Sequence, residues 1–167
     1  MQRREFIQLV GAGAAATTLV GCASTQIDAK NAKVLVIGGG YGGATAAKYL
    51  RMLSGNQLDV TLVEPNSTFV SCPMSNLVVG GLREINQIST PYTGLTRNHG
   101  VKMVKDYVTS IDVEKRTVKL KNGKTLPYDK LVLSPGIDLQ LDKIEGLAAA
   151  NASGQILQAW KAGPETV

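Results

Sequence analysis

An apolar strand that runs directly into a glycine-rich turn is the feature that most constrains this chain. Residues 34–43 read VLVIGGGYGG, and Gly38, Gly40 and Gly43 have the spacing G-x-G-x-x-G. Residues 44–50 are predicted to begin a helix. At such a turn, backbone N–H groups and the positive end of the helix dipole can bind a pyrophosphate. Glycines are needed because side chains would obstruct the turn, the phosphates and the helix–strand contact.

The residues around this turn support a nucleotide site. A second predicted strand, residues 59–63, ends at Glu64, which lies 21 residues after Gly43. A carboxylate about 20 residues after the turn can accept a hydrogen bond from a ribose hydroxyl. We therefore predict an adenine dinucleotide site at the glycine motif and Glu64. An ordinary glycine-rich loop of an α/β domain is the alternative.

The composition is that of a globular α/β protein. The 167 residues are 44% hydrophobic and 19% charged and include 18 glycines, unlike the apolar-poor sequences of disordered chains. The net charge is +5, but Lys and Arg are scattered and few aromatic residues lie among them. We therefore expect no nucleic-acid binding. Cys22, Cys72 and the single histidine, His99, do not have metal-ligand spacing, so we expect no metal site.

Residues 1–21 are predicted to be a signal segment. Arg3 and Arg4 precede Phe6, and an apolar run of small residues extends from 9 to 21. The run is too short to span a bilayer and has the order of an export signal. The arginine pair resembles a twin-arginine signal, which exports proteins already folded around a cofactor. An ordinary secretion signal is the alternative, and either one predicts a periplasmic protein.

Two outcomes of signal cleavage remain open. Residues 19–22, Leu-Val-Gly-Cys, resemble a bacterial lipobox, in which Cys22 would be lipidated and would tether the protein to a membrane. The alternative is ordinary cleavage within residues 23–29. Residues 22–32 are interpreted as a linker to the folded domain.

The chain then alternates short elements with loops. Gly55 and Asn56 are predicted to end the first helix, because both tolerate the left-handed conformation of a C-terminal cap. Residues 65–82 are predicted to be a loop-rich insert. The next predicted elements are a short helix at 92–98 and strands at 101–105 and 107–113.

A hairpin and a final strand complete the pattern. Strands at 116–121 and 124–126 flank Asn122-Gly123, which suits a type I′ turn. The last strand, residues 128–133, ends at Ser134-Pro135-Gly136. This order resembles that of two-dinucleotide-binding flavoproteins. The resemblance implies an α/β fold with a Rossmann-like FAD-binding βαβ unit, a small antiparallel hairpin crossover, and Gly136 close to the cofactor.

Seven segments carry a narrower resemblance: 60–66, 72–76, 79–81, 128–129, 134–138, 142–146 and 159–163. In them the chain resembles the flavoprotein subunits of flavocytochrome c sulfide dehydrogenases, which are relatives of sulfide:quinone reductases. It corresponds only to the first part of those proteins. Residues 33–167 are therefore interpreted as the N-terminal part of an FAD/NAD(P)-binding domain, and the chain is expected to be a fragment or a split product.

The resemblance implies a set of cofactor residues. Gly38, Gly40 and Gly43 would hold the FAD pyrophosphate and Glu64 the adenosine ribose. Cys72 would form a covalent bond to the methyl-bearing ring of FAD. The alternative is that Cys72 is a buried, unreactive cysteine.

The resemblance also implies a path for electrons. They would pass from sulfide, a small-molecule sulfur substrate, through a distal cysteine pair to FAD and then to a c-type cytochrome subunit. Because this chain contains only Cys22 and Cys72, no catalytic residue is assigned to it. A sulfide:quinone reductase-like flavoprotein with noncovalent FAD is one alternative. A truncated nucleotide-binding module without turnover is the other.

Overall fold

The computed structural model describes residues 30–158 and residue 160. The predicted signal segment, residues 1–21, lies outside the described residues, as do Cys22 and most of the predicted linker. Within residues 30–158, every helix is too short or too polar to cross a lipid bilayer.

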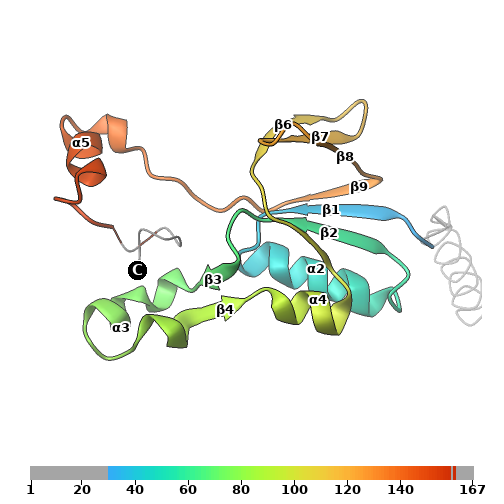
Figure 1. The fold of residues 1–167 in the computed structure, drawn as a ribbon, viewed down its shortest axis with the longest axis horizontal. Helices are drawn as coiled ribbons and strands as arrows, with labels where there is room; N and C mark the ends of the chain where they lie inside the picture. Colours follow the sequence, from blue (N-terminus) through green and yellow to red (C-terminus); the bar gives the residue numbers. More distant parts are fainter. Residues whose placement is uncertain (1–29, 159, 161–167) are drawn as a thin grey trace, which may run out of the picture.

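A four-stranded parallel sheet forms the centre of the molecule, with the strand order β5-β2-β1-β9 (Figure 1). β1 (Lys33–Ile37) lies between β2 (Asp59–Val63) and β9 (Lys130–Leu133), and β2 also pairs with β5 (Lys102–Val104). The central strands are nearly continuous apolar runs, as expected where both faces of a parallel sheet are covered. All four strands run in one direction, so their carboxyl ends meet at one edge.

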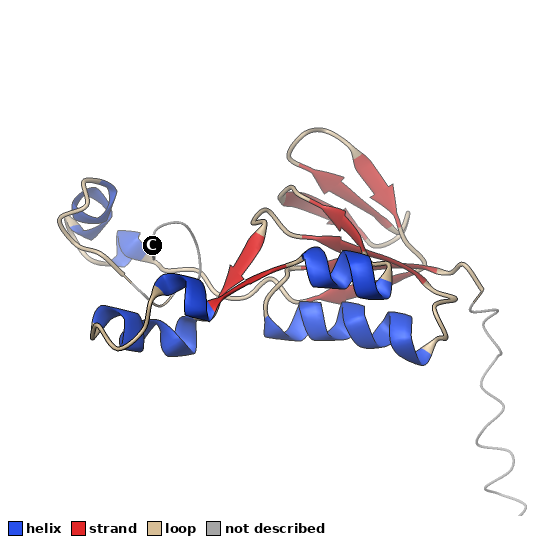
Figure 2. Ribbon diagram, turned by 60° about the horizontal axis from the view of Figure 1, so that its bottom comes forward, coloured by secondary structure: helices blue, strands red, loops and turns tan. Residues whose placement is uncertain are grey.

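Different layers cover the two faces of this sheet. Helices α2 (Tyr41–Leu53) and α4 (Thr93–His99) lie side by side on one face (Figure 2). A three-stranded antiparallel sheet covers the other. Because side chains alternate along a strand, Val34 and Val36 pack toward the helices, whereas Leu35 and Ile37 pack toward the small sheet. The small sheet consists of β6 (Val108–Asp112), β7 (Thr117–Leu120) and β8 (Thr125–Pro127).

Two arms extend from the same side of this body (Figure 1). The first arm occupies the predicted loop-rich insert, residues 65–82, and the residues after it. The insert contains less loop than predicted, because a strand and two short helices form within residues 68–79. The two strands of this arm pair antiparallel. The second follows β9 and contains η3 (Leu141–Lys143) and α5 (Leu147–Ala152). The first arm contains β3 (Thr68–Val70), η1 (Cys72–Met74), α3 (Ser75–Val79), η2 (Ile85–Ile88) and β4 (Ser89–Pro91).

The predicted end of the first helix is confirmed, and the predicted hairpin turn is wrong. Gly55 and Asn56 both have positive φ, 59° and 65°, directly after α2. A type I′ turn needs positive φ at both central residues, but of Asn122 and Gly123 only the glycine has it, at 88°. The Asn122 side chain instead accepts a hydrogen bond from the Lys124 N–H at 2.9 Å. This local bond favours a different turn, and the hairpin is extended by β6 to three strands.

Candidate functional site

The three motif glycines occupy different surroundings at the end of β1. Gly38 has a φ of 93°, and a Cβ built there would lie 1.9 Å from the Ser134 carbonyl oxygen. A Cβ on Gly43 would lie 1.8 Å from the Gly38 carbonyl oxygen. A Cβ on Gly40 would meet no described protein atom within 4 Å. Gly38 and Gly43 therefore permit close packing of the protein itself, whereas Gly40 borders open space.

The first turn of α2 presents free backbone donors. Gly40 is the N-cap residue, and its carbonyl accepts a hydrogen bond from the Ala44 N–H at 2.9 Å. Within the described part of the chain, the N–H groups of residues 40–42 have no hydrogen-bond acceptor. The first turn contains no acidic residue. These donors and the helix dipole together suit a negatively charged ligand.

The side chain of Glu64 lies buried beside this turn. Its Oε2 accepts a hydrogen bond from the Gly39 N–H at 2.8 Å. Its Oε1 accepts from the backbone N–H and the side-chain amide of Asn66, at 2.9 and 3.0 Å. A carboxylate can accept about four hydrogen bonds. Glu64 is thus held in place by the protein and keeps capacity to accept from a further hydroxyl group.

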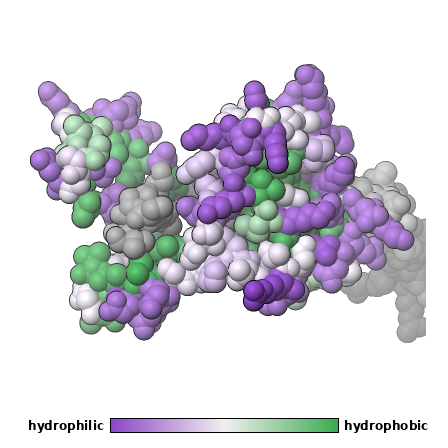
Figure 3. Space-filling view, in the orientation of Figure 1, coloured by the Kyte–Doolittle hydropathy of each residue, from purple (hydrophilic) through white to green (hydrophobic). Residues whose placement is uncertain are grey.

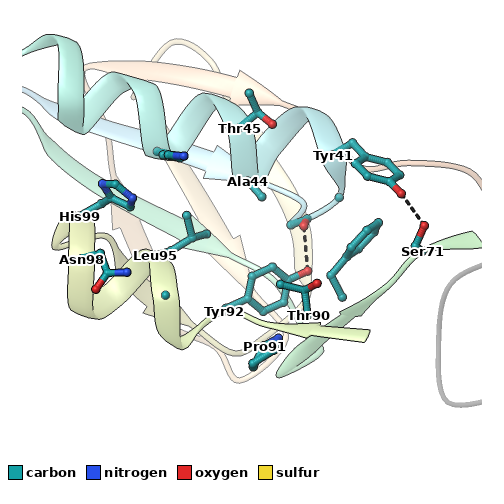
Figure 4. A pocket seen from close by; sticks show the side chains of 15 residues that line it. Tyr41, Ala44, Thr45, Ser71, Thr90, Pro91, Tyr92, Leu95, Asn98 and His99 are labelled. Atoms are coloured by element: carbon teal, nitrogen blue, oxygen red, sulfur yellow. Dashed lines mark hydrogen bonds between the residues drawn. The ribbon is translucent and has the colours of Figure 1, made fainter. Parts of the chain in front are cut away.

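Tyr92 and Gly39 belong to the same cluster, and the sequence analysis missed both. The buried Tyr92 hydroxyl donates to the Gly39 carbonyl at 2.8 Å (Figure 4). The one available signal for Gly39 was its place in the middle of three consecutive glycines, residues 38–40. Tyr92 follows β4 at the start of α4 and belongs to no recognisable motif.

One cavity of about 490 Å³ brings together five of the six predicted cofactor residues. Its volume is within the range of about 300–1,000 Å³ that is usual for ligand pockets. The sixth residue, Gly43, packs beneath the turn against Gly38. The five residues come from the glycine turn, the end of β2, the first arm and the end of β9. They are Gly38, Gly40, Glu64, Cys72 and Gly136.

Cys72 is a free, partly exposed thiol at the start of η1. The Ser75 hydroxyl donates to the Cys72 carbonyl at 2.7 Å. The preceding residue, Ser71, is buried and forms a hydrogen bond with the Tyr41 hydroxyl. The Tyr41 ring also packs edge-on against Phe69, with 4.9 Å between the ring centroids. The first residue of α2 is therefore in direct contact with the segment that carries Cys72.

A second cavity, of about 400 Å³, lies between α2, α4 and the β3–β4 pair (Figure 4). Tyr41 and Tyr92 line both cavities. The far end of the second cavity is formed by Asn98 and His99 at the end of α4. Of the six predicted cofactor residues, only Gly40 lines it.

Comparisons with known sequences show the family of the chain. The chain matches the pyridine nucleotide-disulphide oxidoreductase family over residues 32–161. It is 34% identical over 115 residues to the mitochondrial sulfide:quinone oxidoreductase of Dictyostelium discoideum, covering 69% of this chain and 25% of that protein. It is 59% identical over 46 residues to the sulfide dehydrogenase (flavocytochrome c) flavoprotein chain of Chlorobaculum thiosulfatiphilum, covering 28% of this chain and 94% of that sequence.

Solved structures show the same fold. The sulfide:quinone oxidoreductase of Aquifex aeolicus superposes with a TM-score of 0.61 at 33% identity, covering 65% of this chain and 25% of that one. Bacillus anthracis CoADR-RHD gives a TM-score of 0.67 at 28% identity, covering 81% and 25%. The predicted Rossmann-like α/β fold class is confirmed. The chain spans about a quarter of the length of the sulfide:quinone oxidoreductases that it matches.

Proposed function

We propose that this chain, which belongs to the pyridine nucleotide-disulphide oxidoreductase family, supplies the adenosine-binding part of an FAD-dependent oxidoreductase that acts on sulfide. The observation that carries the proposal is the cavity that unites the glycine turn, Glu64 and Cys72. Several relatives are named as sulfide:quinone oxidoreductases and one as a sulfide dehydrogenase flavoprotein. FAD, when bound, supplies the redox chemistry, and the protein binds and orients it.

The residues at the glycine turn fit the adenosine diphosphate half of FAD. The unpaired N–H groups of residues 40–42 suit the two phosphates. The open space beside Gly40 lets a phosphate approach the backbone. Glu64 has acceptor capacity left for a ribose hydroxyl.

We propose further that Cys72 holds FAD through a thioether bond. Its thiol is partly exposed and lines the same cavity as the glycine turn. Pro73 restricts the backbone of Cys72, and the Ser75 hydroxyl fixes its carbonyl. A covalent bond would prevent loss of FAD in the periplasm, where the cofactor is not replenished.

The remaining parts of the proposal rest on the sequence. The Arg3–Arg4 signal supports export to the periplasm, and the sequence before Cys22 supports a lipid tether there. The resemblance to flavocytochrome c sulfide dehydrogenases supports sulfide as the electron donor and a c-type cytochrome as the acceptor.

A second candidate is a sulfide:quinone oxidoreductase-like flavoprotein with noncovalent FAD. The observation that supports it is the match of sulfide:quinone oxidoreductases to 62–69% of this chain at 33–34% identity. In that case Cys72 would remain a free thiol and electrons would pass to a quinone.

Acid precipitation of the protein purified from its native host separates these candidates. We expect the yellow flavin colour to remain with the wild-type pellet and to pass into the supernatant for Cys72→Ala. The matched control, Asn76→Ala at an exposed position near Cys72, keeps the thiol and should keep the colour in the pellet. Release from the wild type would instead support the quinone-linked candidate. Absence of flavin from the native protein would contradict both candidates and would support a nucleotide-binding module without catalytic activity.

A further inference from the structure

Two buried side chains hold both polar groups of one glycine in the motif. The Gly39 N–H donates to Glu64 Oε2 at 2.8 Å, and the Gly39 carbonyl accepts from the Tyr92 hydroxyl at 2.8 Å. The two side chains also leave no room at this residue. A Cβ on Gly39 would lie 2.5 Å from the Tyr92 hydroxyl oxygen and 2.9 Å from Glu64 Cγ.

The hydrogen bond from Tyr92 also determines where the next N–H group points. The Gly39 carbonyl and the Gly40 N–H belong to one planar peptide unit, and the described residues contain no cis peptide bond. In a trans peptide the two groups point in opposite directions. The Gly40 N–H is therefore directed away from Tyr92, and it has no acceptor within the described residues. Gly40 itself lines the cavity that holds Glu64 and Cys72.

The environment of Tyr92 keeps its hydroxyl a donor. Burial raises the pKa of Tyr92 well above its usual range, and the nearby carboxylate of Glu64 raises it further. The hydroxyl is therefore protonated, and able to donate, at neutral pH. The ring is fixed as well, because it packs in the core formed by Val36, Ala47 and Leu62.

We propose that Tyr92 is a positioning residue for the nucleotide diphosphate: its hydroxyl fixes the Gly39–Gly40 peptide with the Gly40 N–H turned toward the phosphates. This inference rests on the proposed function, because it takes the ligand of the glycine turn to be the diphosphate of FAD. It adds a residue from the β4–α4 junction to a site otherwise built from the carboxyl ends of the central strands and from the first arm.

The test is a titration of the full chain with ADP and with adenosine, by calorimetry, for the wild type and Tyr92→Phe. The variant keeps the ring and loses the hydroxyl. A positioning role predicts that ADP affinity falls about tenfold while adenosine affinity is unchanged. Tyr128→Phe, at a buried tyrosine on the opposite face of the sheet, is the matched control and should bind ADP like the wild type.

An independent measurement on the wild type guards against a variant that fails to fold. In amide NMR spectra, ADP should shift the Gly40 resonance more than those of residues remote from the cavity. The inference is overturned if Tyr92→Phe binds ADP normally, if both ligands weaken equally, or if Gly40 does not shift while ADP binds. A wild-type chain that binds no ADP would contradict the proposed function itself, and this inference with it.

Discussion

Substituting alanine at two glycines of the same motif is expected to affect different properties, stability at Gly43 and ligand binding at Gly40. A Cβ on Gly43 would lie 1.8 Å from the Gly38 carbonyl oxygen, so helix and strand would have to separate. Such overpacking typically costs about 1–3 kcal/mol, and we expect Gly43→Ala to lower the free energy of unfolding by at least that amount. Gly40 has a φ of −65° and open space around it. Gly40→Ala should therefore change stability by less than about 1 kcal/mol but weaken ADP binding.

Urea unfolding and ADP titration on the same samples measure both effects. Gly94→Ala is a suitable control, because Gly94 lies inside α4 and a Cβ there meets no described atom within 4 Å. It should raise stability by about 0.5–1 kcal/mol. A Gly43→Ala protein as stable as the wild type would show that the helix–strand contact is not as close as described.

At the scale of the elements, one side chain joins the ends of the two covering helices. Arg51, near the end of α2, donates from Nε to the His99 carbonyl at 2.8 Å. Its Nη1 donates to the Asn56 carbonyl at 2.7 Å and to the Leu58 carbonyl. One guanidinium group thus connects α2, the end of α4 and the loop that enters β2. The planar fork of arginine allows this, whereas a lysine ammonium cannot reproduce it.

We therefore expect Arg51→Lys to lower the free energy of unfolding by about 1–3 kcal/mol, measured by urea denaturation. Arg97→Lys is the matched control, because Arg97 is exposed on α4, and its effect should stay within about 0.5 kcal/mol. Equal effects of the two variants would mean that the bonds of Arg51 contribute nothing beyond its charge.

Elements with strong local signals were predictable, whereas the short strands of the first arm were not. The order β1, α2, β2 follows from an apolar run, a glycine turn and a helix ended by Gly55 and Asn56. The strands β3 and β4 have three residues each, too few to show a period, and they pair across about 20 residues of chain. The Asn122 turn was wrong because the asparagine side chain bonds locally to Lys124.

The same distinction applies to the candidate site. Glu64 was found by its spacing from the glycine motif, and Cys72 by resemblance. Both residues line one cavity, and their roles in FAD binding stay predictions. Tyr92 lies 28 residues after Glu64 in the sequence. It reaches the turn only because α4 packs beside α2, so no local pattern could have indicated it.

At the scale of the whole molecule, the body and the arms differ in how many of their side chains are buried. β1 and β2 are covered on both faces, whereas α3 buries only Ser75 and α5 buries none of its residues. Apolar side chains gather on both arms in the space-filling view (Figure 3). On the arms, the most exposed apolar side chains are those of Val79 and Leu82 at 77% and Leu157 at 76%.

Hydrogen exchange followed by mass spectrometry should reproduce this division. Amides in poorly buried elements open without unfolding the rest of the protein, whereas central strands exchange only in the largest openings. We expect peptides from α3 and α5 to exchange orders of magnitude faster than those from β1 and β2. Adding ADP should slow exchange at residues 38–43 and leave α5 unchanged, which makes α5 an internal control for ligand effects. Protection of α5 equal to that of β1 would mean that its exposed apolar residues are covered in solution by a further contact, and the arm would then belong to a larger packed unit.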